Sequence, residues 1–117
     1  MAGLTNNAKN VMLDALGAVA VFASLHTADP GTTGTNEVSG GSPAYARKAI
    51  TWNAASAGDL DNNANPTFDV PGSTTITHFG LWSASSGGTF YGSAALASSE
   101  TFGGQGTYTL TDADVTL

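Results

Sequence analysis

The sequence predicts a mainly β protein: a single-domain antiparallel β-sandwich, jelly-roll-like, of about seven short strands with one α-helix at its N-terminus. Three observations lead to this fold class. Short segments with alternating apolar residues recur along most of the chain, and turns rich in Gly, Pro and Asn separate them. One segment near the N-terminus repeats its apolar residues at helical spacing instead. The length of 117 residues, 41% of them hydrophobic, suits one domain with a substantial core.

The helix is expected over residues 4–17, and the sandwich over residues 19–117 of one domain spanning 1–117. Thr5 suits the N-cap, because its hydroxyl can accept a hydrogen bond from a free amide of the first turn. Gly17 suits the position just past the helix end. One face carries the apolar residues Leu4, Ala8, Val11, Met12, Ala15 and Leu16, and the opposite face carries Asn6, Lys9, Asn10 and Asp14. We expect the apolar stripe to pack on the protein's own sheet or, as the alternative, on a neighbouring subunit.

Strands and turns alternate along the first half of the sandwich. Val19–Thr27 alternates as a strand, and an Asp-Pro-Gly turn ends it, since Pro has no amide to donate to a sheet. Residues 32–43 form a Gly- and Ser-rich loop that is long for a connection inside a domain. Residues 45–52 predict the next strand, in which Arg47 and Lys48 are charges that discourage unwanted pairing at a sheet edge.

Shorter strands are expected in the second half of the chain. Leu60 anchors one of them, and Phe68 and Val70 face inward from a strand over residues 66–71. The remaining elements are a Gly-rich loop over residues 98–106 and strands over residues 107–110 and 115–117.

The segment 76–92 is expected to form the central hairpin of the fold, with a turn at Ser85–Gly88, because Gly adopts positive φ at little cost. Strict alternation places Ile76, His78, Gly80 and Trp82 on one face of the first strand and Thr77, Phe79 and Leu81 on the other. Apolar residues on both faces predict a strand buried on both sides, or one covered by a partner chain. Gly80 leaves space that a neighbouring backbone or ring can occupy.

Four of the ten aromatic residues lie in this hairpin. They predict an ordinary hydrophobic core, and the alternative is a ligand-binding aromatic shelf formed by Trp82 and Tyr91. The candidate structural and interface residues are Phe79, Trp82, Phe90, Tyr91, Trp52, Arg47 and His78.

The charge content argues against several classes of protein. Only 10% of the residues are charged, well below the roughly 25% of an average domain, and the net charge is −6. Three basic residues are too few to follow a phosphate backbone or to attract an anionic membrane, so we expect neither nucleic acid nor membrane as a partner. The chain has no Cys, which excludes disulfides and thiolate chemistry. A surface this poor in ions loses little hydration on contact, which favours life inside an assembly.

The sequence predicts no enzyme, no cofactor and no metal. His26 and His78 could act as bases if paired with a carboxylate, but each lies in a predicted strand and no Gly-x-Ser-x-Gly elbow is present. Asp59–Asn63 resembles the opening of a calcium loop, with oxygen side chains at alternate positions. The motif fails further on, because Ala64 stands where Gly is needed and Val70 where a bidentate Glu is needed. We therefore interpret the histidines as core or interface residues and the acidic segment as a solvated turn.

An ordered set of short motifs resembles a family of small tailed-bacteriophage structural proteins, usually labelled phage tail fibre or minor tail proteins. The matching pieces are Leu4-Thr5-Asn6, Ala8-Lys9-Asn10, Leu25-His26-Thr27-Ala28-Asp29-Pro30-Gly31, Glu37-Val38-Ser39-Gly40-Gly41, Tyr45-Ala46-Arg47-Lys48-Ala49 and Thr77-His78-Phe79-Gly80-Leu81-Trp82. They cover most of the chain up to about Tyr91. The resemblance implies a virion building block used in many copies, so symmetric self-association is expected, as a trimer or higher homo-oligomer.

The resulting hypothesis is a non-enzymatic virion structural protein of a tailed phage, in the tail fibre or minor tail class, made in the host cytoplasm. It would contact copies of itself and other tail or major capsid proteins, and we expect loops 32–43 and 98–106 to make such contacts. One alternative is a capsid decoration protein that cements the phage head. Another is a carbohydrate-binding module that recognises host glycans through Trp52, Trp82 or Tyr91.

Overall fold

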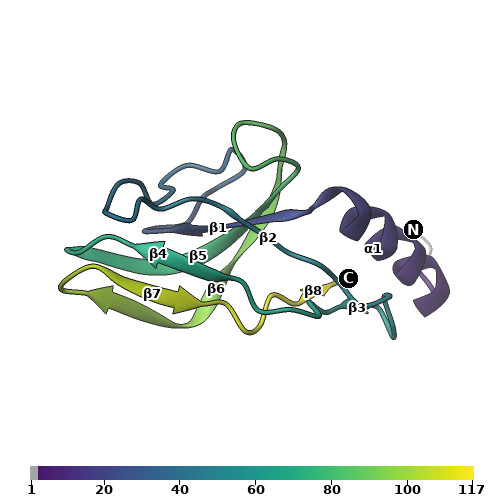
Figure 1. The fold of residues 1–117 in the computed structure, drawn as a ribbon. Coiled ribbons are helices and arrows are strands. Elements are labelled where there is room, and N and C mark those ends of the chain that lie inside the picture. Colours follow the sequence, from purple (N-terminus) through teal and green to yellow (C-terminus); the bar gives the residue numbers. More distant parts are fainter. Residues whose placement is uncertain (1–2) are drawn as a thin grey trace.

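The computed structural model of the protein describes residues 3–117, which contain one helix and eight strands in an elongated body of 48 × 26 × 26 Å (Figure 1). The elements are α1 (Asn6–Val19), β1 (Phe22–His26), β2 (Lys48–Ala49), β3 (Asp59–Leu60), β4 (Thr67–Val70), β5 (Thr74–Trp82), β6 (Phe90–Phe102), β7 (Gly106–Thr109) and β8 (Val115–Thr116). The mainly β prediction with one N-terminal helix is confirmed.

Strand pairing is antiparallel throughout the three sheets formed by residues 3–117. The largest sheet has the order β2-β1-β5-β6, and the pairs β4–β7 and β3–β8 form two smaller sheets. The chain passes from β4 to β5 and from β6 to β7 through short turns, and these turns touch, since a Cβ on Gly72 would lie 3.0 Å from Cα of Gly104. The four-stranded sheet thus faces the β4–β7 pair as the two layers of a sandwich (Figure 1).

The hydrophobic core fills the space between these layers. Its buried members are Ala20, Ala23, Leu25, Val38, Ile50, Phe68, Val70, Ile76, Phe79, Leu81, Leu110 and Ala113. Phe68 and Val70 are completely buried, and Leu60 lies in the short strand β3, as the sequence predicts. Burying this apolar surface supplies most of the driving force for folding.

The alternation along β5 differs from the prediction at one residue. Ile76 belongs to the core cluster with Phe79 and Leu81, rather than to the face of His78 and Trp82. The reason is a register shift between Ile76 and His78, which interrupts the strict alternation of side chains. Downstream of the shift, β5 is buried on both sides as expected, with Leu81 4% and Trp82 8% exposed.

Several predicted boundaries are wrong. The strand expected over 45–52 is reduced to β2, because most of that segment pairs only through isolated bridges or side chains. The loop expected over 98–106 is mostly strand, since β6 continues to Phe102 before turning. Gly17 lies inside α1 rather than past its end, and the lack of a side chain there makes room for the Trp52 ring, since a Cβ would lie 3.3 Å from it.

Helix α1 lies at one end of the long axis, beyond the sandwich (Figure 1). Thr5 is its N-cap as predicted, with the hydroxyl accepting from the amide of Ala8 at 3.1 Å. The expected packing on the sheet through the apolar stripe is wrong. Of that stripe only Leu16 packs against the core, whereas Val11 is 71% exposed and Met12 49%. No helix within residues 3–117 is long and apolar enough to cross a membrane.

Candidate functional site

The sheet face opposite the core carries a buried network of polar side chains. Ser24 and His26 lie two residues apart on β1, so they share a face, and both are completely buried. Ser24 Oγ lies 2.6 Å from His26 Nε2, and His26 Nδ1 lies 2.8 Å from the carbonyl oxygen of Thr35. Because a carbonyl only accepts, Nδ1 carries the proton and the Ser24 hydroxyl donates to Nε2. Trp82 Nε1 completes the network by donating to Ser24 Oγ at 2.8 Å.

Gly80, on the neighbouring strand, makes room for this network. It pairs with Ser24 in the β1–β5 register. A Cβ at this position would lie 2.6 Å from Ser24 Oγ, 2.8 Å from His26 Nε2 and 3.0 Å from the Phe90 ring. The sequence-based expectation that Gly80 makes room for a neighbouring group is therefore confirmed, and the group is a buried Ser–His pair.

Two loops and an ion pair cover the network. Arg47 donates from Nε and Nη2 to the two carboxylate oxygens of Glu37, at 3.0 and 3.1 Å. It also donates from Nη1 to the carbonyls of Ala84 and Gly87, and its guanidinium lies 3.6 Å from the centre of the Trp82 ring. Arg47 thereby ties the 28–47 segment to the hairpin loop after β5. Its predicted role as edge-strand charge is wrong, because its side chain is only 9% exposed.

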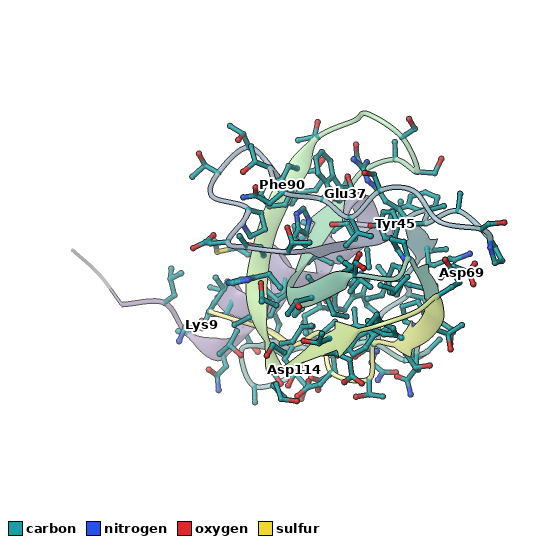
Figure 2. The ribbon with its side chains drawn as sticks, turned by 90° about the vertical axis from the view of Figure 1, so that its left-hand side faces the viewer. Lys9, Glu37, Tyr45, Asp69, Phe90 and Asp114 are labelled. Carbon is teal, nitrogen blue, oxygen red and sulfur yellow. The ribbon has the colours of Figure 1, made fainter. Side chains whose placement is uncertain are left out.

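Tyr45 extends the same cluster toward the core. Its hydroxyl donates to Glu37 at 2.9 Å and accepts from the amide of Leu25 at 3.0 Å. Burial raises the pKa of Tyr45, so the phenol stays protonated. Figure 2 shows Glu37, Tyr45 and Phe90 on the same side of the molecule, well away from Asp114.

This arrangement has two parts of a nucleophilic triad but lacks the access that catalysis needs. Ser24 and His26 are completely buried, and the His26 Nδ1 partner is a backbone carbonyl rather than a carboxylate. His78 bonds through Nδ1 to the Thr77 hydroxyl at 2.7 Å. Among residues 3–117 neither imidazole hydrogen-bonds a carboxylate.

The buried imidazole makes stability sensitive to acid. Burial lowers the pKa of His26, because the charged form would lose its hydration. The unfolded chain therefore takes up a proton below about pH 6.5, where the folded chain does not, and stability falls as pH decreases. Asp114→Asn removes a carboxyl whose raised pKa has the opposite effect between about pH 4 and pH 7, so we expect the free energy of unfolding of this variant, measured by urea titration, to decline from pH 7 to pH 5.5. The same decline with His78→Asn added would assign the effect to His26, whereas its loss in that double variant would contradict the assignment.

A second polar cluster lies near the helix end of the molecule. Asp59, Asp61 and Asp114 each place a carboxylate oxygen within 4.8 Å of the others. The pairing of β3 with β8 brings them together, with Thr116 donating to Asp59 at 2.8 Å. The predicted solvated turn is thus a strand end that faces a second acidic segment. Hydrogen bonding to Asp61, together with desolvation and the nearby Asp112, raises the pKa of Asp114 to about 7.

This raised pKa predicts a stability penalty at alkaline pH. Folded Asp114 keeps its proton up to about pH 7, whereas the unfolded residue loses it near pH 4, so stability falls as pH rises through this range. Asp114→Asn is expected to raise the thermal midpoint at pH 8 and to change it little at pH 4. Because Asp114 is exposed, added salt should shrink the difference at pH 8. An equal shift of the thermal midpoint at both pH values would show that repulsion between Asp114 and the neighbouring carboxylates is not the cause.

The aromatic residues do not form one shelf. Trp82 packs with Arg47 and Ser24 on the covered face of the sheet. Tyr91 is 41% exposed and shares a surface groove with Leu16 and Val115 on the other side. Trp52 is half-buried and donates to the carbonyl of Ala20 at 3.0 Å. The alternative of a shelf formed by Trp82 and Tyr91 therefore does not hold, because the two rings lie on different sides of the sheet.

The sequence reasoning missed the partners that make these clusters. Ser24, Glu37 and Tyr45 were not singled out, and neither was the approach of Asp114 to Asp59. The i, i+2 spacing of Ser24 and His26 on one strand was the available signal for the first cluster.

Comparison with known proteins gives a family match over nearly the whole chain. No curated protein matches the chain. The family model described as Podophage GP4 fiber I protein gp80 matches residues 3–117. The match extends over all the elements described above, from α1 to β8. The chain therefore belongs to the podophage GP4 fiber I protein gp80 family of phage fibre proteins.

Proposed function

We propose that this protein is a non-enzymatic building block of a podophage tail fibre, and that it acts by binding copies of itself and other virion proteins. The observation that carries the proposal is the distribution of apolar side chains. Large apolar residues that a single chain leaves in water are Leu4, Val11, Met12, Val19, Tyr91 and Leu117. Four of them, Leu4, Val11, Met12 and Val19, lie in α1 or just before it, and exposed apolar residues that gather in this way mark contact surfaces. Membership of a fibre family supports the location.

The absence of enzymatic activity is part of the same proposal. The two histidines are held by a Ser hydroxyl, a Thr hydroxyl and a backbone carbonyl, so within residues 3–117 neither is paired for base catalysis. In this protein Arg47 and Glu37 connect loops to one another, which suits a structural role in the virion better than catalysis of a reaction.

Among the candidate interface residues, the exposed ring of Tyr91 is the most available for a neighbour. Trp82 and Phe79 are buried, and Arg47 is occupied by Glu37, so these three support the surface from within. Residues 32–43 and the turn after β6 remain proposed contacts with neighbouring subunits, since most of them are exposed.

Labelling the protein in intact virions tests the location. Antibody or tag density on the tail fibres is the expected result. Density distributed over the head in a regular lattice would instead favour the capsid decoration role, and its absence from the virion would refute both. Binding of purified protein to host glycans, lost in Tyr91→Ala, would favour the carbohydrate-binding role.

A further inference from the structure

Helix α1 turns its polar side toward its own domain. Asn10 Oδ1 accepts from the amide of Gly58 at 2.9 Å, and Asp14 Oδ1 accepts from the amide of Ala55 at 2.7 Å. Leu13 is 1% exposed, and Gly17 lies against the Trp52 ring. These contacts fix which side of the helix faces the body.

The opposite side of α1 is apolar and faces solvent. Its exposed residues are Val11, Met12, Ala15, Ala18 and Val19, and the half-buried Ala8 lies on the same side. A surface helix ordinarily turns its apolar stripe inward, so this orientation is the reverse of the usual one. The helix is anchored by its polar side, which leaves the apolar stripe free for contact.

The spacing of this stripe is that of a coiled-coil seam. Within α1, Ala8, Val11, Ala15 and Ala18 follow one another at intervals of three, four and three residues, which is the spacing of the a and d positions of a coiled-coil heptad. Small side chains at three of these four positions allow the helix backbones to approach closely.

The occupant that best fits this face is a second copy of the chain. The four seam positions carry no charged side chain, so the face offers nothing to select an oppositely charged partner, and nothing that would repel a copy of itself. The nearby charges Lys9 and Asp14 lie toward the 54–58 segment instead. Two copies also have the same spacing of seam residues along α1, so that corresponding residues can pack against one another along the contact.

The seam needs the folded body to work. A helix of 14 residues is only about 21 Å long, and a peptide of this length is barely helical in water. Anchoring through Leu13, Asn10 and Asp14 removes the entropic cost of forming the helix on association, because the helix is already formed and oriented before a copy arrives.

We propose that α1 is the self-association element of this fibre protein, and that copies join through the outward seam of Ala8, Val11, Ala15 and Ala18. The inference rests on the proposed self-association and specifies its surface. It places the contact at one end of the elongated body (Figure 1).

Sedimentation of the purified protein with matched charge variants tests the surface. Val11→Glu is expected to raise the dissociation constant of the oligomer at least tenfold, because it buries carboxylates in the seam. Its circular dichroism should be unchanged, since Val11 is 71% exposed in the single chain. Ala97→Glu, on the exposed edge strand β6, is the control and should leave the mass unchanged.

A cysteine variant gives an independent readout, because the chain has no Cys of its own. Mild oxidation of Val11→Cys should give a covalent dimer, and Ala97→Cys should not. A protein that is monomeric at every concentration, or an oligomer dissociated by Ala97→Glu and not by Val11→Glu, would overturn the role of α1. Labelling on the fibre together with an oligomer dissociated only by Ala97→Glu would leave the proposed function standing and remove only this inference, whereas a monomer at every concentration would also remove the proposed binding to copies of itself. Binding of another virion protein to the seam of a monomer would likewise overturn it.

Discussion

Gly80→Ala is expected to lower the free energy of unfolding by about 3 kcal/mol, the upper range for overpacking a core. The added methyl group would lie 2.6 Å from Ser24 Oγ and 2.8 Å from His26 Nε2. Neither atom can retreat easily, because each is hydrogen-bonded and both side chains are completely buried. Relieving the clash would break bonds whose donors or acceptors would then stay buried without partners. Urea titration by tryptophan fluorescence would measure the loss.

Gly92→Ala is the matched control for this prediction. Gly92 lies on the adjacent strand β6, opposite Leu81, and a Cβ there would meet nothing within 4 Å. Both substitutions remove the same conformational freedom from the unfolded chain, so that contribution cancels in the comparison. Equal stability of the two variants would show that the Ser24–His26 network can shift to accept a side chain.

Arg47→Ala is expected to destabilise the protein by about 3 kcal/mol, the lower end for breaking a buried ion pair. The low end applies because Glu37 keeps 23% of its side chain in contact with water. The variant would lose both bonds to Glu37, the bonds to the carbonyls of Ala84 and Gly87, and the stacking on Trp82. Thermal unfolding would measure the change.

Two further variants separate charge from geometry at this site. Arg47→Lys keeps the charge but cannot form the two-pronged contact or stack as a plane, so we expect it to recover less than half of the loss. Lys48→Ala, at the next residue, should change stability by less than about 0.5 kcal/mol, as is usual for a surface substitution. Full stability in Arg47→Lys would contradict the importance of the planar guanidinium.

Local patterns predicted the elements that depend on neighbouring residues. The Thr5 N-cap, the inward positions of Phe68 and Val70, and the burial of β5 on both sides all follow from spacing along one segment. Boundaries that depend on distant contacts were wrong. Gly17 makes room for the distant Trp52 ring inside the helix and does not mark the helix end. Strand β6 continues because β5 offers pairing partners as far as Thr74.

Residue types and their periodicity are enough to predict the mainly β class, the apolar stripe of the helix, and a composition that favours assembly over catalysis, because they are fixed before the chain folds. The direction in which each surface faces depends on the folded protein. Loops from residues 28–47 and 83–89 seal Ser24 and His26 away from solvent, because Arg47 binds Glu37 in the first loop and the carbonyls of Ala84 and Gly87 in the second. Asn10 and Asp14 accept hydrogen bonds from the amides of Gly58 and Ala55, and these bonds turn the helix so that its apolar stripe faces outward. Such orientations arise from contacts between segments that are distant along the chain, and a periodic pattern carries no information about them.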